Sequence, residues 1–133
     1  MESAVLVDSS FFIKLLREGR DPATELLRNA ELLDLATCGM VRLEVARGVI
    51  APKKRSALEG FMDVMMNVPT DNKLWIEATQ LAWDLDRDGI VLPATDIVIA
   101  AAARRIGAAV LAFDKHFGMI AGLTVFRSLD ELH

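Results

Sequence analysis

Hydrophobic positions along this chain fall into blocks whose period changes several times. Short apolar runs at residues 4–7, 32–38, 108–113 and 123–126 have the length and composition of buried strands. Between these runs, apolar residues recur at spacings of three and four, which predicts helices. The predicted helices cover residues 9–18, 22–29, 40–50, 52–67, 72–88 and 95–107.

Local signals mark several helix ends. Asp21 followed by Pro22 is typical of a cap and a first helical position, and Asp71 can cap the long helix that Gly89 ends. Within that long helix the predicted buried stripe consists of Trp75, Ala78, Ala82 and Leu85, and Trp83 is also expected to pack inside. The helix at 95–107 is apolar nearly all round, so we expect it at the centre of the fold.

Methionines gather in the segment "FMDVMM", residues 61–66. Side chains of this kind are most often core, and we predict that role here. The alternative is an adaptable groove for a partner helix, because methionine is unbranched and repacks easily.

Alternation of strands with helices predicts an α/β fold with a mainly parallel sheet and helices on both faces. The chain has no internal repeat and no linker, so residues 1–133 are expected to form one domain. In such sheets ligands bind beyond the carboxyl ends of the strands. Asp8 follows the first strand and Asp114 follows the strand at 108–113. Both carboxylates should therefore lie at the same edge.

Composition narrows the possible functions. Hydrophobic residues make up 53% and charged residues 26%, which suits a globular protein, and no apolar run approaches the ~20 residues that cross a bilayer. A net charge of −4 argues against a general basic coat for nucleic acid, although local basic groups occur at residues 53–55, 104–105 and 115. The single cysteine, Cys38, excludes an intramolecular disulfide and favours a reducing, cytoplasmic compartment.

Two acidic residues at helix starts have ordinary structural explanations. Asp8 can cap the helix that begins at residue 9, although the neighbouring serines can do the same. Asp96 can act as a favourable charge in the first turn of its helix, with Thr95 as the cap.

Glu44 and Asp114 also have such explanations. Glu44 can pair with Arg47 at a spacing of three on the helix surface. Asp114 can be a turn residue after its strand.

Taken together, the four carboxylates indicate more than their separate roles. Carboxylates that meet at one sheet edge repel one another, and a divalent cation removes that repulsion. Oxygen ligands favour Mg²⁺ or Mn²⁺, and a water activated by such an ion can attack a phosphodiester. The sequence offers no Cys/His cluster for zinc, no Walker-type phosphate loop and no serine-hydrolase elbow.

Four stretches occur in an order that is similar to a known family: "VLVDSSFFI", "RLEVARGV", "LPATDIVIAAAA" and "VLAFDKHF". Together they resemble the PIN-domain ribonucleases, and among them the VapC-like toxins of toxin–antitoxin pairs. The resemblance implies a three-layer α/β/α sandwich with a central, mainly parallel sheet. It also implies Asp8, Glu44, Asp96 and Asp114 as catalytic, metal-binding residues for Mg²⁺- or Mn²⁺-dependent cleavage of RNA. The partners it implies are a second copy of the chain and a VapB-like antitoxin.

The chain departs from the family pattern at two positions. Ala112 stands where members usually carry Ser or Thr, and His116 stands where many carry Asp. Ser10 is a candidate for the missing hydroxyl, and His116 for contact with metal-bound water or phosphate. Lys115 is the basic residue best placed in the sequence to contact phosphate.

Two other functions remain open at this point. The first is a catalytically silent PIN-like module that binds RNA or protein, which the loss of a hydroxyl at Ala112 favours. The second is a phosphoacceptor signalling domain, but the chain lacks paired acidic residues after the first strand.

Overall fold

A five-stranded sheet forms the centre of the computed structural model, which describes residues 4–132. All of its pairings are parallel, and the strand order is β3-β2-β1-β4-β5. The strands are β1 (Val5–Val7), β2 (Leu35–Cys38), β3 (Met66–Val68), β4 (Ala109–Leu111) and β5 (Val125–Phe126). The predicted α/β fold with a parallel sheet is confirmed.

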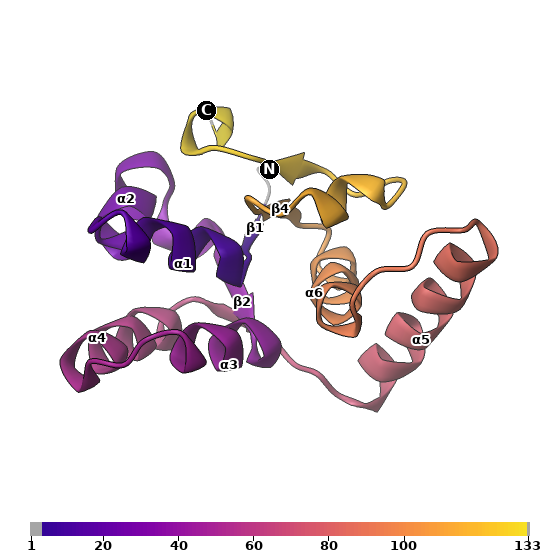
Figure 1. Ribbon diagram of the computed structural model, residues 1–133, viewed down its shortest axis with the longest axis horizontal. Helices are drawn as coiled ribbons and strands as arrows, with labels where there is room; N and C mark the ends of the chain where they lie inside the picture. Colours follow the sequence, from indigo (N-terminus) through magenta and orange to yellow (C-terminus); the bar gives the residue numbers. More distant parts are fainter. Residues whose placement is uncertain (1–3, 133) are drawn as a thin grey trace.

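Six α-helices surround the sheet: α1 (Ser9–Arg17), α2 (Pro22–Asn29), α3 (Gly39–Arg47), α4 (Pro52–Asp63), α5 (Asn72–Arg87) and α6 (Ala94–Arg105). Helices α1 to α4 lie to one side of the strands, and α5 with α6 lies to the other (Figure 1). Short 3₁₀ turns η1 (Leu32–Asp34), η2 (Lys115–Met119) and η3 (Leu129–Leu132) complete the described elements. No helix among the described residues combines the length and the apolar character that a membrane span requires.

The segment after α4 differs from the prediction. The helix expected to reach residue 67 ends at Asp63, and Met66–Val68 instead pairs with β2 as an edge strand. Met62 and Met65 are buried, which confirms their predicted role in the core, whereas Met66 is exposed. Pairing with β2 therefore overrides the helical pattern at the end of this segment.

The buried face of α5 confirms Ala78 and Leu85 of the predicted stripe, but it contains Leu74 and Leu81 in place of Trp75 and Ala82. Its buried residues are Leu74, Ala78, Leu81 and Leu85. Trp75 is 46% exposed and Trp83 is 55% exposed, so the expectation that both indoles pack inside was wrong. The Trp83 ring instead carries the Arg87 guanidinium, 4.5 Å from its centroid. The physical reason is that leucine side chains supply the contacts with α6, which leaves the indoles outside.

Helix α6 is buried as predicted. Every residue from Asp96 to Ala103 is buried, and the helix packs against α5 on one side and β4 on the other. Its first residue is Ala94, and Pro93 occupies the cap position without a side-chain bond, so Thr95 does not cap the helix. Burial of the helix from Asp96 onward places the Asp96 carboxylate in the interior, although Ala94 before it is exposed.

Candidate metal centre

Asp8 occupies the single position between β1 and α1, and its two carboxylate oxygens differ in environment. Oδ2 accepts a hydrogen bond of 3.1 Å from the backbone N–H of Ser10, which caps the helix. Oδ1 is buried and has no hydrogen-bond partner, and the residue is 2% exposed. Capping therefore accounts for one oxygen and leaves the other available to a ligand.

Like charges gather around this carboxylate. The pKa of Asp8 is raised to about 6, chiefly by burial and also by the nearby charges of Asp96 and Glu44, while the hydrogen bonds from Ser10 oppose the shift. The pKa of Asp96 is also raised, first by burial and then by the charge of Asp114, while His116 opposes the shift. In the part of the chain that the structure describes, no Lys or Arg forms an ion pair with any of the four predicted carboxylates.

Asp114 lies at the same sheet edge as Asp8, as predicted. Strands β1 and β4 are parallel neighbours, and the backbone N–H of Asp8 donates to the carbonyl of Leu111 at 2.9 Å. Asp114 follows β4 after a short loop and caps η2, because its Oδ1 accepts the backbone N–H of His116 at 2.8 Å. Asp114 is therefore a turn residue after its strand, and it also lies at the sheet edge that it shares with Asp8.

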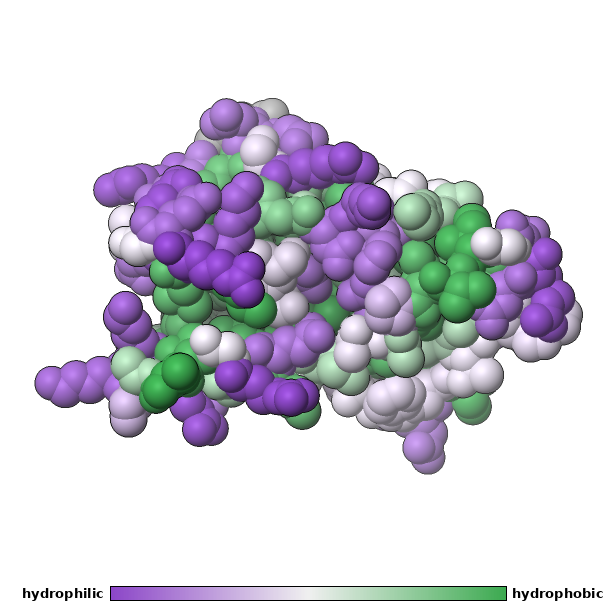
Figure 2. Space-filling view, in the orientation of Figure 1, coloured by the Kyte–Doolittle hydropathy of each residue, from purple (hydrophilic) through white to green (hydrophobic). Residues whose placement is uncertain are grey.

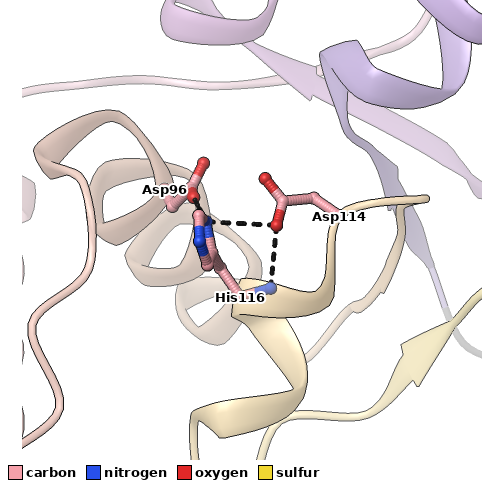
Figure 3. Close-up of side chains that lie close together, drawn as sticks. All are labelled: Asp96, Asp114 and His116. Carbon is pink, nitrogen blue, oxygen red and sulfur yellow. Dashed lines mark hydrogen bonds and ion pairs between the residues drawn. The ribbon is translucent and has the colours of Figure 1, made fainter.

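His116 joins two of the carboxylates. Its Nδ1 lies 2.7 Å from Asp96 Oδ2 and 3.1 Å from Asp114 Oδ1 (Figure 3). One ligand atom from each of the three residues falls within 4.8 Å of the others. The imidazole therefore belongs to the acidic cluster itself.

Glu44, on α3, reaches the site through a hydrogen bond that the sequence did not predict. The Ser9 hydroxyl donates to Glu44 Oε1 at 2.9 Å. Within residues 4–132 Glu44 forms no ion pair with Arg47, so that structural explanation was wrong. The two serines after Asp8 were visible in the sequence as hydroxyl groups near the site. The sequence did not show that Ser9 bonds Glu44, because Glu44 lies 35 residues away in the chain.

Ser10, the predicted substitute for the missing hydroxyl, contacts the segment that carries Asp114. Its Oγ accepts the backbone N–H of Phe113 at 3.0 Å, directly beside the fully buried Ala112. The Phe113 ring stacks on Phe11 with centroids 5.6 Å apart. The hydroxyl thus fixes the loop between β4 and Asp114 to the start of α1.

The basic groups differ in their positions. Arg105 pairs with Asp71 at 2.9 Å and Arg104 donates to the carbonyl of Ala121, so both stabilise the fold. Lys115 is exposed next to Asp114, and Lys53 is exposed at the start of α4. These two lysines remain available to an external anion.

The donor set fits a divalent cation. The carboxylates of Asp8, Asp96 and Asp114 and the imidazole of His116 lie around the C-terminal ends of β1 and β4, and Ser9 connects Glu44 to them. The buried Oδ1 of Asp8 has no donor among the described residues. Oxygen-rich sites of this kind bind Mg²⁺ or Mn²⁺. The parallel sheet and its acidic edge therefore define an α/β protein with a candidate centre for a divalent metal.

Comparison with known proteins agrees with this class. The PIN domain model matches residues 5–123, and the chain belongs to the PIN domain family. A search of curated proteins found no match. The family match supports the PIN interpretation over the phosphoacceptor one.

Solved structures share the fold at low sequence identity. The crystal structure of DNA-bound VapBC from Salmonella typhimurium is 19% identical with a TM-score of 0.77, over 93% of this chain and 97% of that chain. FitAcB from Neisseria gonorrhoeae is 20% identical with a TM-score of 0.75, over 92% of this chain and 96% of that chain. PAE2754 from Pyrobaculum aerophilum is 18% identical with a TM-score of 0.66, over 98% and 95%. The fold is therefore that of VapC-like PIN proteins.

Proposed function

We propose that this protein is a metal-dependent endoribonuclease and the toxin of a VapBC-type toxin–antitoxin pair. The observation that carries the proposal is the convergence of Asp8, Glu44, Asp96 and Asp114 at one sheet edge, where no Lys or Arg of the described residues pairs with them. Family membership supports a nuclease, and the structural neighbours support a toxin. The whole chain is proposed to act as one PIN domain, in the reducing cytoplasm that the free, buried Cys38 favours.

The roles of the side chains follow from their surroundings. Mg²⁺ or Mn²⁺, when bound, supplies charge neutralisation, a more acidic water and stabilisation of the developing phosphorane charge. Asp8 Oδ1, Asp96 and Asp114 are assigned to hold the ion, because they surround the buried end of the site. Ser9 fixes Glu44 through Oε1, which leaves Oε2 to accept a proton from the attacking water.

An RNA substrate is supported by the exposed basic groups near the acidic edge. Lys115 directly follows Asp114 in the chain and is exposed, so its ammonium group can contact a phosphate next to the scissile one. We expect the substrate to be a single-stranded segment of RNA, because its bases are unpaired and its flexible backbone can adapt to the site.

A VapB-like antitoxin is the proposed protein partner. Several structural neighbours are VapBC structures, which supports such a partner for this chain. A groove of about 360 Å³ lies between the turn that joins α1 to α2 and the exposed side of α4, and Leu16, Pro22 and Leu58 supply apolar surface there. A groove of this size suits the apolar side chains of an inserted segment.

A homodimer is also proposed. Ile76 and Trp83 are exposed on the outer face of α5, and Val91 is exposed in the segment that leads to α6. Figure 2 shows apolar surface on this side of the molecule. A second copy of the chain would cover this surface.

The decisive experiment is cleavage of a single-stranded RNA pool of randomised sequence by the wild type and by Asp8→Asn. We expect cleavage with Mg²⁺ or Mn²⁺, no cleavage in EDTA, and a loss of about 100-fold or more in the variant, because an ion ligand is removed. Asp86→Asn, an exposed carboxylate on α5, is the matched control and should cleave normally. Full activity of a folded Asp8→Asn protein would refute the proposal.

A silent binding module is the second candidate, and a specific observation favours it. Ala112 is fully buried and carries no hydroxyl beside the site. Such a module would bind the same RNA pool without hydrolysing it, and it would do so equally well in EDTA.

A further inference from the structure

The imidazole of His116 adds nitrogen to a site that is otherwise built from oxygen. Its side chain is one-third exposed, and Nδ1 faces the interior of the cluster rather than solvent (Figure 3). Nδ1 contacts an oxygen of Asp96, which belongs to α6, and an oxygen of Asp114, which caps η2. We propose that His116 is itself a metal ligand through Nδ1, and that it makes the centre select Mn²⁺ over Mg²⁺. This inference rests on the proposed metal-dependent function.

The spacing of the three donor atoms carries the first part of the argument. Adjacent ligands of an octahedral ion at about 2.1 Å lie about 3 Å from each other. The observed separations from Nδ1, 2.7 Å to Asp96 and 3.1 Å to Asp114, lie on either side of that value. One ion can thus contact all three atoms after small side-chain movements, and it would replace the hydrogen bond that joins Nδ1 to Asp96.

A second observation comes from a different element. Asp8 Oδ1 is buried without any partner, and the charge of Asp96 is close enough to raise the pKa of Asp8. This oxygen is a further donor for the same ion, and no protein group satisfies it among the described residues. The cluster therefore provides three oxygens and one nitrogen.

Donor chemistry determines the choice of ion. Mg²⁺ is a hard cation that prefers oxygen and keeps its water ligands, whereas imidazole suits first-row transition metals. Replacement of one oxygen donor by Nδ1 should weaken Mg²⁺ relative to Mn²⁺. In the sequence, His116 is the one residue of the proposed ligand set that is not a carboxylate.

The backbone favours this placement of the imidazole. The N–H of His116 donates to Asp114 Oδ1 at 2.8 Å, which fixes the start of η2. The buried Phe117 follows and anchors the turn in the core. The backbone position of His116 is therefore maintained by contacts that do not need the ion.

The test uses the whole chain and metal binding rather than cleavage. Calorimetry of the wild type should show Mn²⁺ binding at least about tenfold tighter than Mg²⁺. Pulsed electron paramagnetic resonance of the Mn²⁺ protein should show coupling to an imidazole ¹⁴N nucleus. His116→Asn should lose that coupling and reduce the Mn²⁺ preference by about tenfold or more. His116→Asp should favour Mg²⁺ instead.

The chain has two histidines, so His133→Asn is the matched control and should behave as the wild type. Absence of ¹⁴N coupling in the wild type, or an unchanged Mn²⁺ preference in a folded His116→Asn protein, would overturn the inference alone. If neither ion binds the wild type at all, both the inference and the proposed metal-dependent function fail.

Discussion

At the scale of single residues, Asp8 combines a structural and a chemical role. Its Oδ2 caps α1, and its Oδ1 is buried without a partner. The same fold that needs the cap therefore places a second oxygen in a medium where its charge is costly. The fold tolerates this because Asp8 can bind a proton in place of a cation, as its raised pKa shows.

This raised pKa predicts how stability depends on pH in metal-free protein. The pKa of Asp8 rises from 3.8 to about 6 on folding, so the folded state binds the proton more tightly. The contribution of Asp8 to the free energy of unfolding is therefore largest below pH 4 and falls as pH rises through 6. The total fall is up to about 3 kcal/mol at ~1.4 kcal/mol for each pKa unit.

The measurement is urea unfolding of the wild type and Asp8→Asn in EDTA between pH 4 and pH 7.5. We expect the variant to gain stability relative to the wild type as pH rises. Asp71→Asn is the control, because the backbone N–H of Leu74 and the Arg105 guanidinium lower the pKa of Asp71, so the difference between this variant and the wild type should stay nearly constant over this range and change only below pH 4. A constant difference between wild type and Asp8→Asn across this range would contradict the prediction.

At the scale of elements, glycines terminate helices by two different geometries. Gly89 has φ of +81° after α5, and its N–H and that of Ile90 donate to the carbonyls of Asp86 and Leu85. This is a Schellman motif, which requires a left-handed residue. Gly48 also ends a helix, α3, but its φ is −85°.

Alanine substitutions should separate these two geometries. Gly89→Ala should destabilise the protein by about 1–2 kcal/mol, because a Cβ is strained at positive φ. Gly48→Ala should stabilise it by about 0.4–1 kcal/mol, because the unfolded chain loses freedom. A Cβ at Gly48 would lie 3.6 Å from the nearest atom of Ile13, an ordinary contact. Thermal unfolding of both variants measures the effect, and equal shifts would refute the distinction.

Helix boundaries that depend on local residues were predicted correctly from the sequence. The predictions that were wrong concern features that depend on contacts between distant parts of the chain. The start of α2 at Pro22 and the end of α5 before Gly89 depend on residues at the boundary itself. Strand β3 exists because Met66 to Val68 pairs with β2, and no three-residue pattern reveals such a pairing. The prediction for Trp75 and Trp83 on α5 was wrong, because the spacing of apolar residues does not show which of them lie at the edge of the buried face and which at its centre.

In the candidate site, too, local sequence signals predicted some features and non-local contacts determined the others. The positions of Asp8 and Asp114 after parallel strands predicted their shared edge, which the structure confirms. The bond from Ser9 to Glu44 and the contact of His116 with Asp96 connect distant segments, so chain order alone did not reveal them. What each carboxylate does chemically stays a prediction.

At the scale of the whole molecule, the outer face of α5 predicts self-association. Ile76 is 69% exposed, and the leucines of α5 are all buried on the opposite face of the helix. Sedimentation of the wild type should give a dimer, and Ile76→Glu should give a monomer because a charge would be buried at the interface. Leu33→Glu, which changes an exposed leucine in η1, is the matched control and should remain dimeric. A wild type that sediments as a monomer would refute the prediction.

The order of strands has a consequence for synthesis on the ribosome. Strand β1 pairs with β4, whose residues emerge only after all six helices have been translated. This pairing cannot form before β4 has been synthesised, and contacts over such a sequence distance slow folding. Asp8 therefore cannot meet Asp114 until the chain has been synthesised beyond β4. A nascent chain carries each carboxylate but no assembled centre, so nuclease activity would begin only after β4 has left the exit tunnel.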